Sequence, residues 1–463
     1  MLRPHQVAPG KHLLEVLRSN DAAVDFSDMG TGKTAVAVWV AQQLKLPTLV
    51  VCPDICQSAW HRMATLFGDT LSVINYESLR TGKTPYGYWD KPATGRTYQY
   101  KCINCQCKFK PGQAVPACYC RHDGIHCFDT QKISAPRGRF NFHSAVQMVI
   151  FDEVHRCNGD SLNADMLIAA KRQSKRILML SATAAHTPLH FKAIGYAAGL
   201  HGLANYYSWL HSKGVRRIPG QGMKWMLGAD RQREVMESIH QQLFPSRGIR
   251  MRIQDIPDFP KVDIQAELYD IGHEHEINQL YQELGALDKD PENPLTKRLR
   301  LRQKIELLKV PLAEQLTRDY RAKGFSVSVF CNFSATLEAL AGKLKTNCVL
   351  SGANTQKERD ANVDLFQRNE VGEILVNTKV GGAGLSLPDL DGQHPRVGLV
   401  FPSDSVLDME QIFGRLPRTD SKSTSYYRVL LANGTVEVKT YSAFKRHSNN
   451  IKAMNNGDLR PEL

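Results

Sequence analysis

Short runs of apolar residues recur along the chain. They occur at residues 47–53, 147–151, 176–180, 325–330, 373–376 and 396–401. Runs of this kind, apolar at almost every position, are typical of parallel strands that are buried on both faces. Segments with helical spacing of apolar residues lie between them, such as 58–67 and the stripe of Leu301, Ile305 and Leu308. The alternation predicts an α/β protein.

The pattern is interrupted twice. Residues 81–139 are rich in Gly, Pro, Lys and Tyr, and they separate strands that a short connection would otherwise join. Residues 201–260 are mixed, and Pro257 to Pro260 is typical of a boundary; regular alternation resumes at Val262. We therefore expect an insert at 81–139 and a helical connector at 201–260. A chain of 463 residues has room for two or three domains.

A glycine-containing loop lies between the apolar segment that begins near Val24 and the helical segment 35–44. It reads Asp-Met-Gly-Thr-Gly-Lys-Thr, from Asp28 to Thr34. A strand, such a loop and a helix together cradle nucleotide phosphates: the glycines turn backbone N–H groups inward, the lysine reaches the β- and γ-phosphates, and the threonine holds Mg²⁺. The sequence thus predicts an ATP site. The nucleotide-contacting residues are Met29, Gly30, Thr31, Gly32, Lys33 and Thr34.

Two adjacent carboxylates follow the predicted strand at 147–151. Asp152 and Glu153 stand at its carboxyl end, where parallel sheets place ligands. Asp152 is predicted to orient the hydrated Mg²⁺ together with Thr34, and Glu153 to position and deprotonate the attacking water. After the strand at 176–180, the hydroxyls of Ser181 and Thr183 either bridge the nucleotide site to a bound strand or form a simple turn.

The second half carries its own polar motifs after predicted strands. A Gly-rich segment without Gly-Lys-Thr spans residues 381–387 and includes Gly384. Gln411, Gly414, Arg415 and Arg418 then lie on a predicted helix, and arginines three apart share one helical face. From a second domain, Arg415 and Arg418 could reach the γ-phosphate across a cleft.

Six of the eleven cysteines lie between Cys102 and Cys127. Clustered cysteines inside a cell favour a metal over disulfides, and thiolates select Zn²⁺. We expect a structural zinc held by Cys102 and Cys105 and by a second pair, Cys118 and Cys120. His122, His126 and Cys127 stay open as alternatives for the second pair, and free thiols are the alternative to a metal site.

Charge and hydropathy narrow the class of partner. Lysine and arginine exceed aspartate and glutamate by 59 to 46, which gives a formal charge of +13 and favours a polyanion such as nucleic acid. No apolar run approaches the roughly 18 residues of a membrane span, and the N-terminus has no secretory pattern, so we expect an intracellular protein.

Aromatic and basic residues alternate between Tyr206 and Trp225, which fits either a nucleic-acid surface or aromatic packing.

The ordered motifs together resemble those of superfamily 2 helicases and translocases, closest to Swi/Snf-like and phage branch-migration members. The motifs are Arg3-Pro4-His5-Gln6, the Gly30 to Thr34 loop, Asp152 to His155, Ser181 to Thr183, the Gly381 to Leu387 segment, and Gln411 to Arg418. The resemblance implies two RecA-like domains in tandem, 1–200 and 261–463, with ATP in the cleft between them. It also implies that Gln6 contacts adenine, that Gly384 lies at the nucleotide, and that Gln411, Arg415 and Arg418 join Lys33 and Glu153 in catalysis.

The predicted function is that of an ATP-dependent DNA helicase or translocase, phage-encoded and monomeric, acting on forked, branched or single-stranded DNA in replication, recombination or repair. It would work in the cytoplasm of an infected host cell with ATP, Mg²⁺ and Zn²⁺. An RNA helicase is one alternative. A DNA-stimulated ATPase that remodels nucleoprotein without strand separation is the other.

Overall fold

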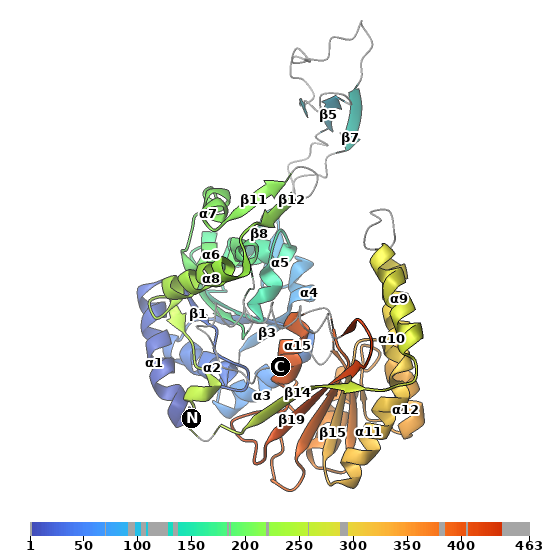
Figure 1. Cartoon of the computed structure of the whole chain (residues 1–463). Coiled ribbons are helices and arrows are strands. Elements are labelled where there is room, and N and C mark those ends of the chain that lie inside the picture. Colours follow the sequence, from blue (N-terminus) through green and yellow to red (C-terminus); the bar gives the residue numbers. More distant parts are fainter. Residues whose placement is uncertain are drawn as a thin grey trace, which may run out of the picture.

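The computed structural model describes two parallel sheets and the helices that cover them (Figure 1). The described residues are 2–69, 71–90, 138–182, 185, 187–218, 222–257, 259–287, 295–378, 385–403 and 406–437, with the backbone of three further strands. Those three strands form a small antiparallel sheet within the predicted insert: β5 (Tyr98–Cys102), β6 (Lys108–Phe109) and β7 (Phe128–Lys132).

The first large sheet has six strands, all parallel to their neighbours. Their order is β13 (Gly248–Ile249), β1 (Ala22–Asp25), β10 (Arg176–Leu180), β9 (Met148–Asp152), β2 (Thr48–Cys52) and β3 (Ser72–Asn75). Successive residues of a strand point to opposite faces, and both faces here are apolar, as the unbroken apolar runs predicted.

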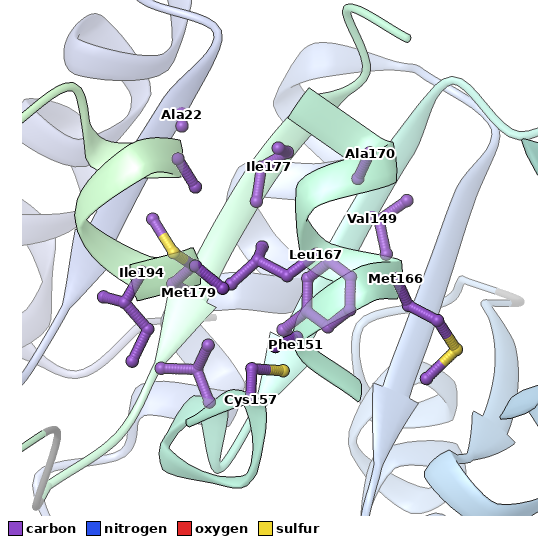
Figure 2. Close-up of a cluster of buried hydrophobic side chains, with 14 of the residues drawn as sticks. Ala22, Val149, Phe151, Cys157, Met166, Leu167, Ala170, Ile177, Met179 and Ile194 are labelled. Atoms are coloured by element: carbon purple, nitrogen blue, oxygen red, sulfur yellow. The ribbon is translucent and has the colours of Figure 1, made fainter. Parts of the chain in front are cut away.

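Helices cover both faces of this sheet. One face packs against α1 (Pro4–Ser19), α2 (Lys33–Leu44) and α3 (Gln57–Leu66). The other packs against α4 (Tyr76–Arg80), α5 (Leu162–Arg172), α6 (Phe191–Ala198) and α8 (Ala229–Leu243). Figure 2 shows part of the second core, where Phe151 and Met179 of the sheet meet Leu167 of α5 and Ile194 of α6. This dense packing fixes the carboxyl ends of the strands, where the polar residues lie.

The second large sheet is also six-stranded and parallel. Its order is β14 (Val262–Tyr269), β19 (Ser425–Ala432), β18 (Arg396–Val400), β15 (Ser326–Cys331), β17 (Glu373–Asn377) and β16 (Val349–Leu350). The core on one face includes α11 (Val310–Ala322) and α12 (Ser334–Leu344); that on the other includes α13 (Gln356–Gln367) and α15 (Val406–Phe413). A hairpin of α9 (Glu274–Leu287) and α10 (Leu295–Leu308) stands beside the sheet (Figure 1).

The connecting segment folds onto the first sheet. Its α8 buries Met236, Ile239 and Leu243 in the core of that sheet, and β13 adds a strand next to β1. The segment also holds α7 (Tyr206–Ser212) and the antiparallel pair β11 (Val215–Ile218) and β12 (Gly222–Trp225). Another antiparallel pair, β4 (Gly87–Trp89) and β8 (Phe140–Phe142), flanks the insert.

The aromatic residues of the connecting segment serve mainly in packing. Tyr206 is buried, Trp209 and Trp225 pack against its cluster, and the Trp225 indole N–H donates to the carbonyl of Lys213 at 2.9 Å. Tyr207 is the exposed exception, at 58%. Of the two interpretations of this stretch, aromatic packing therefore accounts for Tyr206, Trp209 and Trp225.

Among the described helices, none is long and apolar enough to cross a membrane.

Candidate nucleotide site between the two sheets

The glycine loop joins β1 to α2 and requires its two glycines. Gly30 and Gly32 have φ values of +82° and +90°, a region that residues with a Cβ rarely adopt. A Cβ on Gly30 would lie 3.0 Å from the carbonyl oxygen of Pro417, and one on Gly32 would lie 2.0 Å from Nε2 of Gln6. The loop is therefore pressed against the second sheet's domain on one side and against α1 on the other. Thr34 lies in the first turn of α2.

Lys33 folds back over the loop. Its Nζ donates to the carbonyls of Ser27, at 2.8 Å, and Asp28, at 3.0 Å. Burial lowers the pKa of Lys33, opposed chiefly by the negative charges of Asp25 and Glu153. An ammonium held only by its own loop can turn to an anion, and the N-terminus of α2 adds N–H groups that favour negative charge. The loop thus fits the phosphates of a nucleotide.

Gln6 is buried and fully occupied. Its Oε1 accepts from the N–H of Arg3 at 3.0 Å, and its Nε2 donates to the carbonyl of Thr31 at 2.9 Å. In this arrangement Gln6 ties the start of α1 to the glycine loop. A role at adenine stays a prediction.

The two carboxylates lie at the end of β9, beside the glycine loop. Asp152 Oδ1 accepts from the N–H of Glu153 at 2.9 Å, and its Oδ2 accepts from the indole N–H of Trp60 at 2.8 Å. The Tyr76 hydroxyl donates to the carbonyl of Asp152, also at 2.8 Å. Burial, followed by the Glu153 charge, raises the pKa of Asp152. The carboxylate is therefore oriented by Trp60, as a cation-binding group needs, while Tyr76 fixes the backbone of the same residue.

Glu153 adopts a backbone conformation unusual for its residue type. Its φ is +51°, and left-handed backbone in a non-glycine residue is often found at functional sites. Burial would raise its pKa, but the His155 hydrogen bond and the charges of His155, Arg415 and Lys33 outweigh burial and lower it. Apart from Nδ1 of His155, 3.4 Å away, its buried Oε2 has no hydrogen-bond partner among the described residues. Such an acceptor fits a water molecule that needs to be positioned and deprotonated.

His155 connects the two domains at this point. Its Nδ1 lies 3.2 Å from the Ser181 hydroxyl and 3.4 Å from Glu153 Oε2, and its Nε2 lies 3.3 Å from the amide nitrogen of Gln411. Gln411 is itself buried, and the imidazole of His155 therefore lies between the acidic pair of one domain and helix α15 of the other.

Arg415 and Arg418 do not lie on a helix as predicted, because α15 ends at Phe413 and both arginines follow it. Arg415 is 3% exposed. Burial lowers its pKa, and the negative charge of Glu153 is the largest influence that opposes this lowering. Both arginines bond within their own domain: Nη1 of Arg415 and Nη2 of Arg418 donate to the carbonyl of Leu385, at 3.2 and 2.8 Å, and Arg418 also donates to the hydroxyl of Ser386 at 3.0 Å. Both arginines therefore support the loop at 385–386, and the charge of Glu153 acts on Arg415 in addition.

The domains touch at the nucleotide loop and beyond it. A Cβ on Gly414 would lie 2.3 Å from Sδ of Met29, so the two backbones approach closely there. Farther out, Arg359 pairs with Asp54 at 3.6 Å and the Gln356 amide donates to the Ser58 hydroxyl at 3.2 Å. Residues from both domains thus enclose the site.

Several contributors were not predicted from the sequence. Trp60 was expected in the core, with contact to a phosphodiester backbone as the alternative, and no role was assigned to His155 or Tyr76. The same holds for Arg250, which pairs with the buried Asp28 at 2.5 Å and returns from the connecting segment to the glycine loop. Local sequence offers a signal for His155, next to the acidic pair, but none for Trp60 or Arg250.

Some predicted residues lie outside the described part of the chain. These are Thr183, Gly384, the side chain of Cys102, and Cys105, Cys118, Cys120, His122, His126 and Cys127. Among the described residues, no group of three or more His, Cys, Asp or Glu side chains is placed to hold a metal. The zinc site stays a prediction.

Comparison with known proteins identifies the class of the second domain. Residues 306–420 match the helicase conserved C-terminal domain. The chain therefore carries a helicase C-terminal domain, and its fold is that of two RecA-like parallel-sheet domains in tandem, as predicted.

Individual relatives extend over nearly the whole chain. A protein of Acanthamoeba polyphaga mimivirus, provisionally named ATP-dependent RNA helicase L364, is 28% identical over 480 aligned positions, covering 99% of this chain and 84% of its own length. The structure of S. cerevisiae Dbp5 bound to RNA and ADP BeF3 aligns with 96% of this chain and 91% of its own, at 10% identity and a TM-score of 0.48.

Proposed function

We propose that the protein is an ATP-dependent helicase that uses ATP hydrolysis to move along and separate strands of nucleic acid. The observation that carries the proposal is the convergence of Lys33, the Asp152–Glu153 pair and Arg415 at one enclosed site, with Arg415 coming from the other domain. Such a site loses its arginine whenever the domains separate. Hydrolysis and domain movement are then coupled, as a motor requires.

Each side chain has a distinct task in this scheme. The glycine loop and Lys33 hold the β- and γ-phosphates, while Thr34 and Asp152 would hold Mg²⁺, which neutralises charge on those phosphates. Trp60 and Tyr76 keep Asp152 in place. Glu153 orients the attacking water and takes up its proton, and Arg415 stabilises negative charge that develops on the transferred phosphoryl group.

RNA is the substrate that we favour. The name of the mimivirus relative, which aligns with 99% of the chain, supports it. Branched DNA is the second candidate, because the sequence motifs resemble those of Swi/Snf-like and phage branch-migration proteins. The viral relative also agrees with a role inside an infected host cell.

The test is ATP hydrolysis without nucleic acid and with single-stranded RNA, duplex RNA, single-stranded DNA, duplex DNA and four-way-junction DNA. Strand separation is measured beside it on the same substrates. We expect stimulation by RNA and separation of RNA duplexes that have a single-stranded tail. Stimulation of hydrolysis by DNA alone would make branched DNA the favoured substrate. Stimulation of hydrolysis without strand separation would indicate a remodelling ATPase. No hydrolysis on any substrate would refute the site.

The zinc proposal has its own test. Metal analysis of protein purified without chelators should find about one Zn²⁺ per chain, and Cys102→Ser with Cys105→Ser should remove it. Zinc-free protein would leave free thiols as the correct interpretation.

A further inference from the structure

A second cavity lies at the carboxyl edge of the second sheet, away from the nucleotide site. It has a volume of about 520 Å³. Its floor comes from residues that directly follow strands: Asn332 after β15, Thr378 after β17 and Phe401 after β18. Its outer wall is the α9–α10 hairpin, which contributes Tyr281 and Arg302. Carboxyl edges of parallel sheets are the usual place for ligands.

Buried hydrogen bonds hold the floor of the cavity rigid. Glu306 accepts from the backbone and the side-chain amide of Asn332, at 2.9 and 2.8 Å, and from the N–H of Phe333 at 3.2 Å. Lys309 pairs with Glu437 at 2.5 Å and donates to the carbonyl of Leu430 at 3.2 Å. Neutral N–H groups hold Glu306, and Lys309 pairs with Glu437, so these charged groups are already engaged with protein groups and a ligand there can be neutral.

The outer wall is strongly basic. Helix α10 carries five Lys or Arg residues and a single acidic residue, the buried Glu306. Four of the basic side chains are exposed: Lys297, Arg300, Arg302 and Lys304. Only Arg302 of these four also lines the cavity. A polyanion on α10 would therefore pass the opening of the cavity.

The chemistry of the opening fits a flat aromatic ring. Tyr281 and Phe333 offer aromatic surface, Arg302 a planar guanidinium, and Leu299 an apolar side chain that is 39% exposed. Unstacked bases bind on such surfaces, next to basic side chains that hold phosphates. The charged groups of the floor are already bonded within the protein, which suits a neutral ring. The basic wall suits the phosphate backbone to which that ring is attached.

We propose that this cavity takes up one unstacked nucleobase of the bound strand while α10 holds the adjoining phosphates. The inference rests on the proposed function and adds a base-binding position to it. Such a position would let the second domain grip the strand at one defined nucleotide during each cycle.

Gly285 provides a direct way to block the cavity. It lines the cavity on α9, its φ is not in the left-handed region, and a Cβ built on it meets no atom within 4 Å. Gly285→Phe should therefore fill the opening and leave the fold intact, because replacing a helical glycine reduces the entropy of the unfolded chain. Gly342→Phe is the matched control: Gly342 is also helical, has the same open surroundings, and lies outside the cavity.

The experiment measures binding of a fluorescein-labelled single-stranded RNA in which one abasic site is moved along the strand. For the unaltered protein we expect one position at which the abasic site weakens binding about tenfold, in the range of a lost base–aromatic stack. Gly285→Phe should lower affinity for the intact strand about tenfold and abolish the dependence on abasic position. Gly342→Phe should do neither.

Charge gives a second, independent comparison. Arg302→Gln and Arg300→Gln each remove one charge from the same helix, and both should reduce the salt dependence of binding equally. Only Arg302→Gln should also reduce the abasic effect. Equal affinity for all abasic strands, with unaltered RNA-stimulated hydrolysis, would overturn the base site alone. Absence of any nucleic-acid binding would overturn the proposed function with it.

Discussion

The two sheets have the same number of strands and the same parallel arrangement, but their carboxyl edges differ in chemistry. The edge of the first sheet gathers Lys33, Asp152 and Glu153 within one enclosed site. The edge of the second is divided: Gln411 and Arg415 face the first domain, whereas the cavity behind Asn332 faces the α9–α10 hairpin. The fold supplies a common edge, and the loops after each strand decide what that edge binds.

The difference also shows how the domains depend on each other. The first edge holds the phosphate-binding and water-activating groups but has Arg415 only while the second domain is in contact. The second edge supplies that arginine but lacks a glycine loop with lysine. In the proposed mechanism, hydrolysis therefore requires both edges.

The largest expected effect is at Lys33. Lys33→Ala removes the ammonium from the phosphate loop, and hydrolysis should be abolished, a loss beyond the roughly 10²- to 10³-fold scale of one charge-stabilising donor. RNA affinity should change little, because exposed basic residues carry it. Filter binding and phosphate release on the same preparation test both statements. Lys11→Ala, at an exposed position of α1, is the control, and hydrolysis that survives in Lys33→Ala would contradict the assignment.

Substitutions at Arg415 and Arg418 compare the contributions of two neighbouring arginines to catalysis and to stability. Arg415→Lys should reduce kcat about 10³-fold with ATP binding retained, as for other arginines that stabilise phosphoryl transfer. Arg418→Lys should reduce kcat less than tenfold but lower the free energy of unfolding by about 1–2 kcal/mol, since its bonds to Leu385 and Ser386 are lost. Single-turnover kinetics and urea unfolding measure the two quantities. Equal losses in kcat would mean that Arg418 leaves these partners when ATP binds.

Arg250 tests how far the first edge depends on the connecting segment. Arg250→Met removes the cation that pairs with the buried Asp28, and we expect a loss of about 3 kcal/mol in the free energy of unfolding. Adding Asp28→Asn should recover part of that loss, because the buried negative charge is gone. Chemical denaturation of the single and double variants gives the coupling between them. Additive losses would show that the pair contributes no coupling.

Trp60 should give the smallest effect and the most specific. Trp60→Phe keeps an aromatic ring but removes the hydrogen bond to Asp152, so the Mg²⁺ concentration for half-maximal hydrolysis should rise about tenfold. Direct Mn²⁺ binding should weaken in parallel. Trp39→Phe, in the same core without a bond to the acidic pair, serves as the control. If the Mg²⁺ concentration for half-maximal hydrolysis is unchanged in Trp60→Phe, Trp60 contributes only to core packing.

The local parts of the site were predictable because their chemistry is contiguous in sequence. Gly30 to Thr34 must form a loop before a helix, since the glycines adopt positive φ and apolar residues follow at helical spacing. Asp152 and Glu153 follow an apolar run, which places them at the end of a buried strand. Arg415 and Arg418 looked equivalent, and only the structure separates them.

The sequence alone determined the alternation of buried strands and amphipathic helices, the two-domain parallel architecture, the glycine loop and the acidic pair, because each is encoded in the spacing of a few neighbouring residues. Tertiary structure decided which distant side chains complete the site. Trp60 reaches Asp152 across 92 positions, and Arg250 reaches Asp28 across 222. Such contacts depend on how helices and connecting segments pack against the sheet, and no local pattern of apolar and polar residues records that packing.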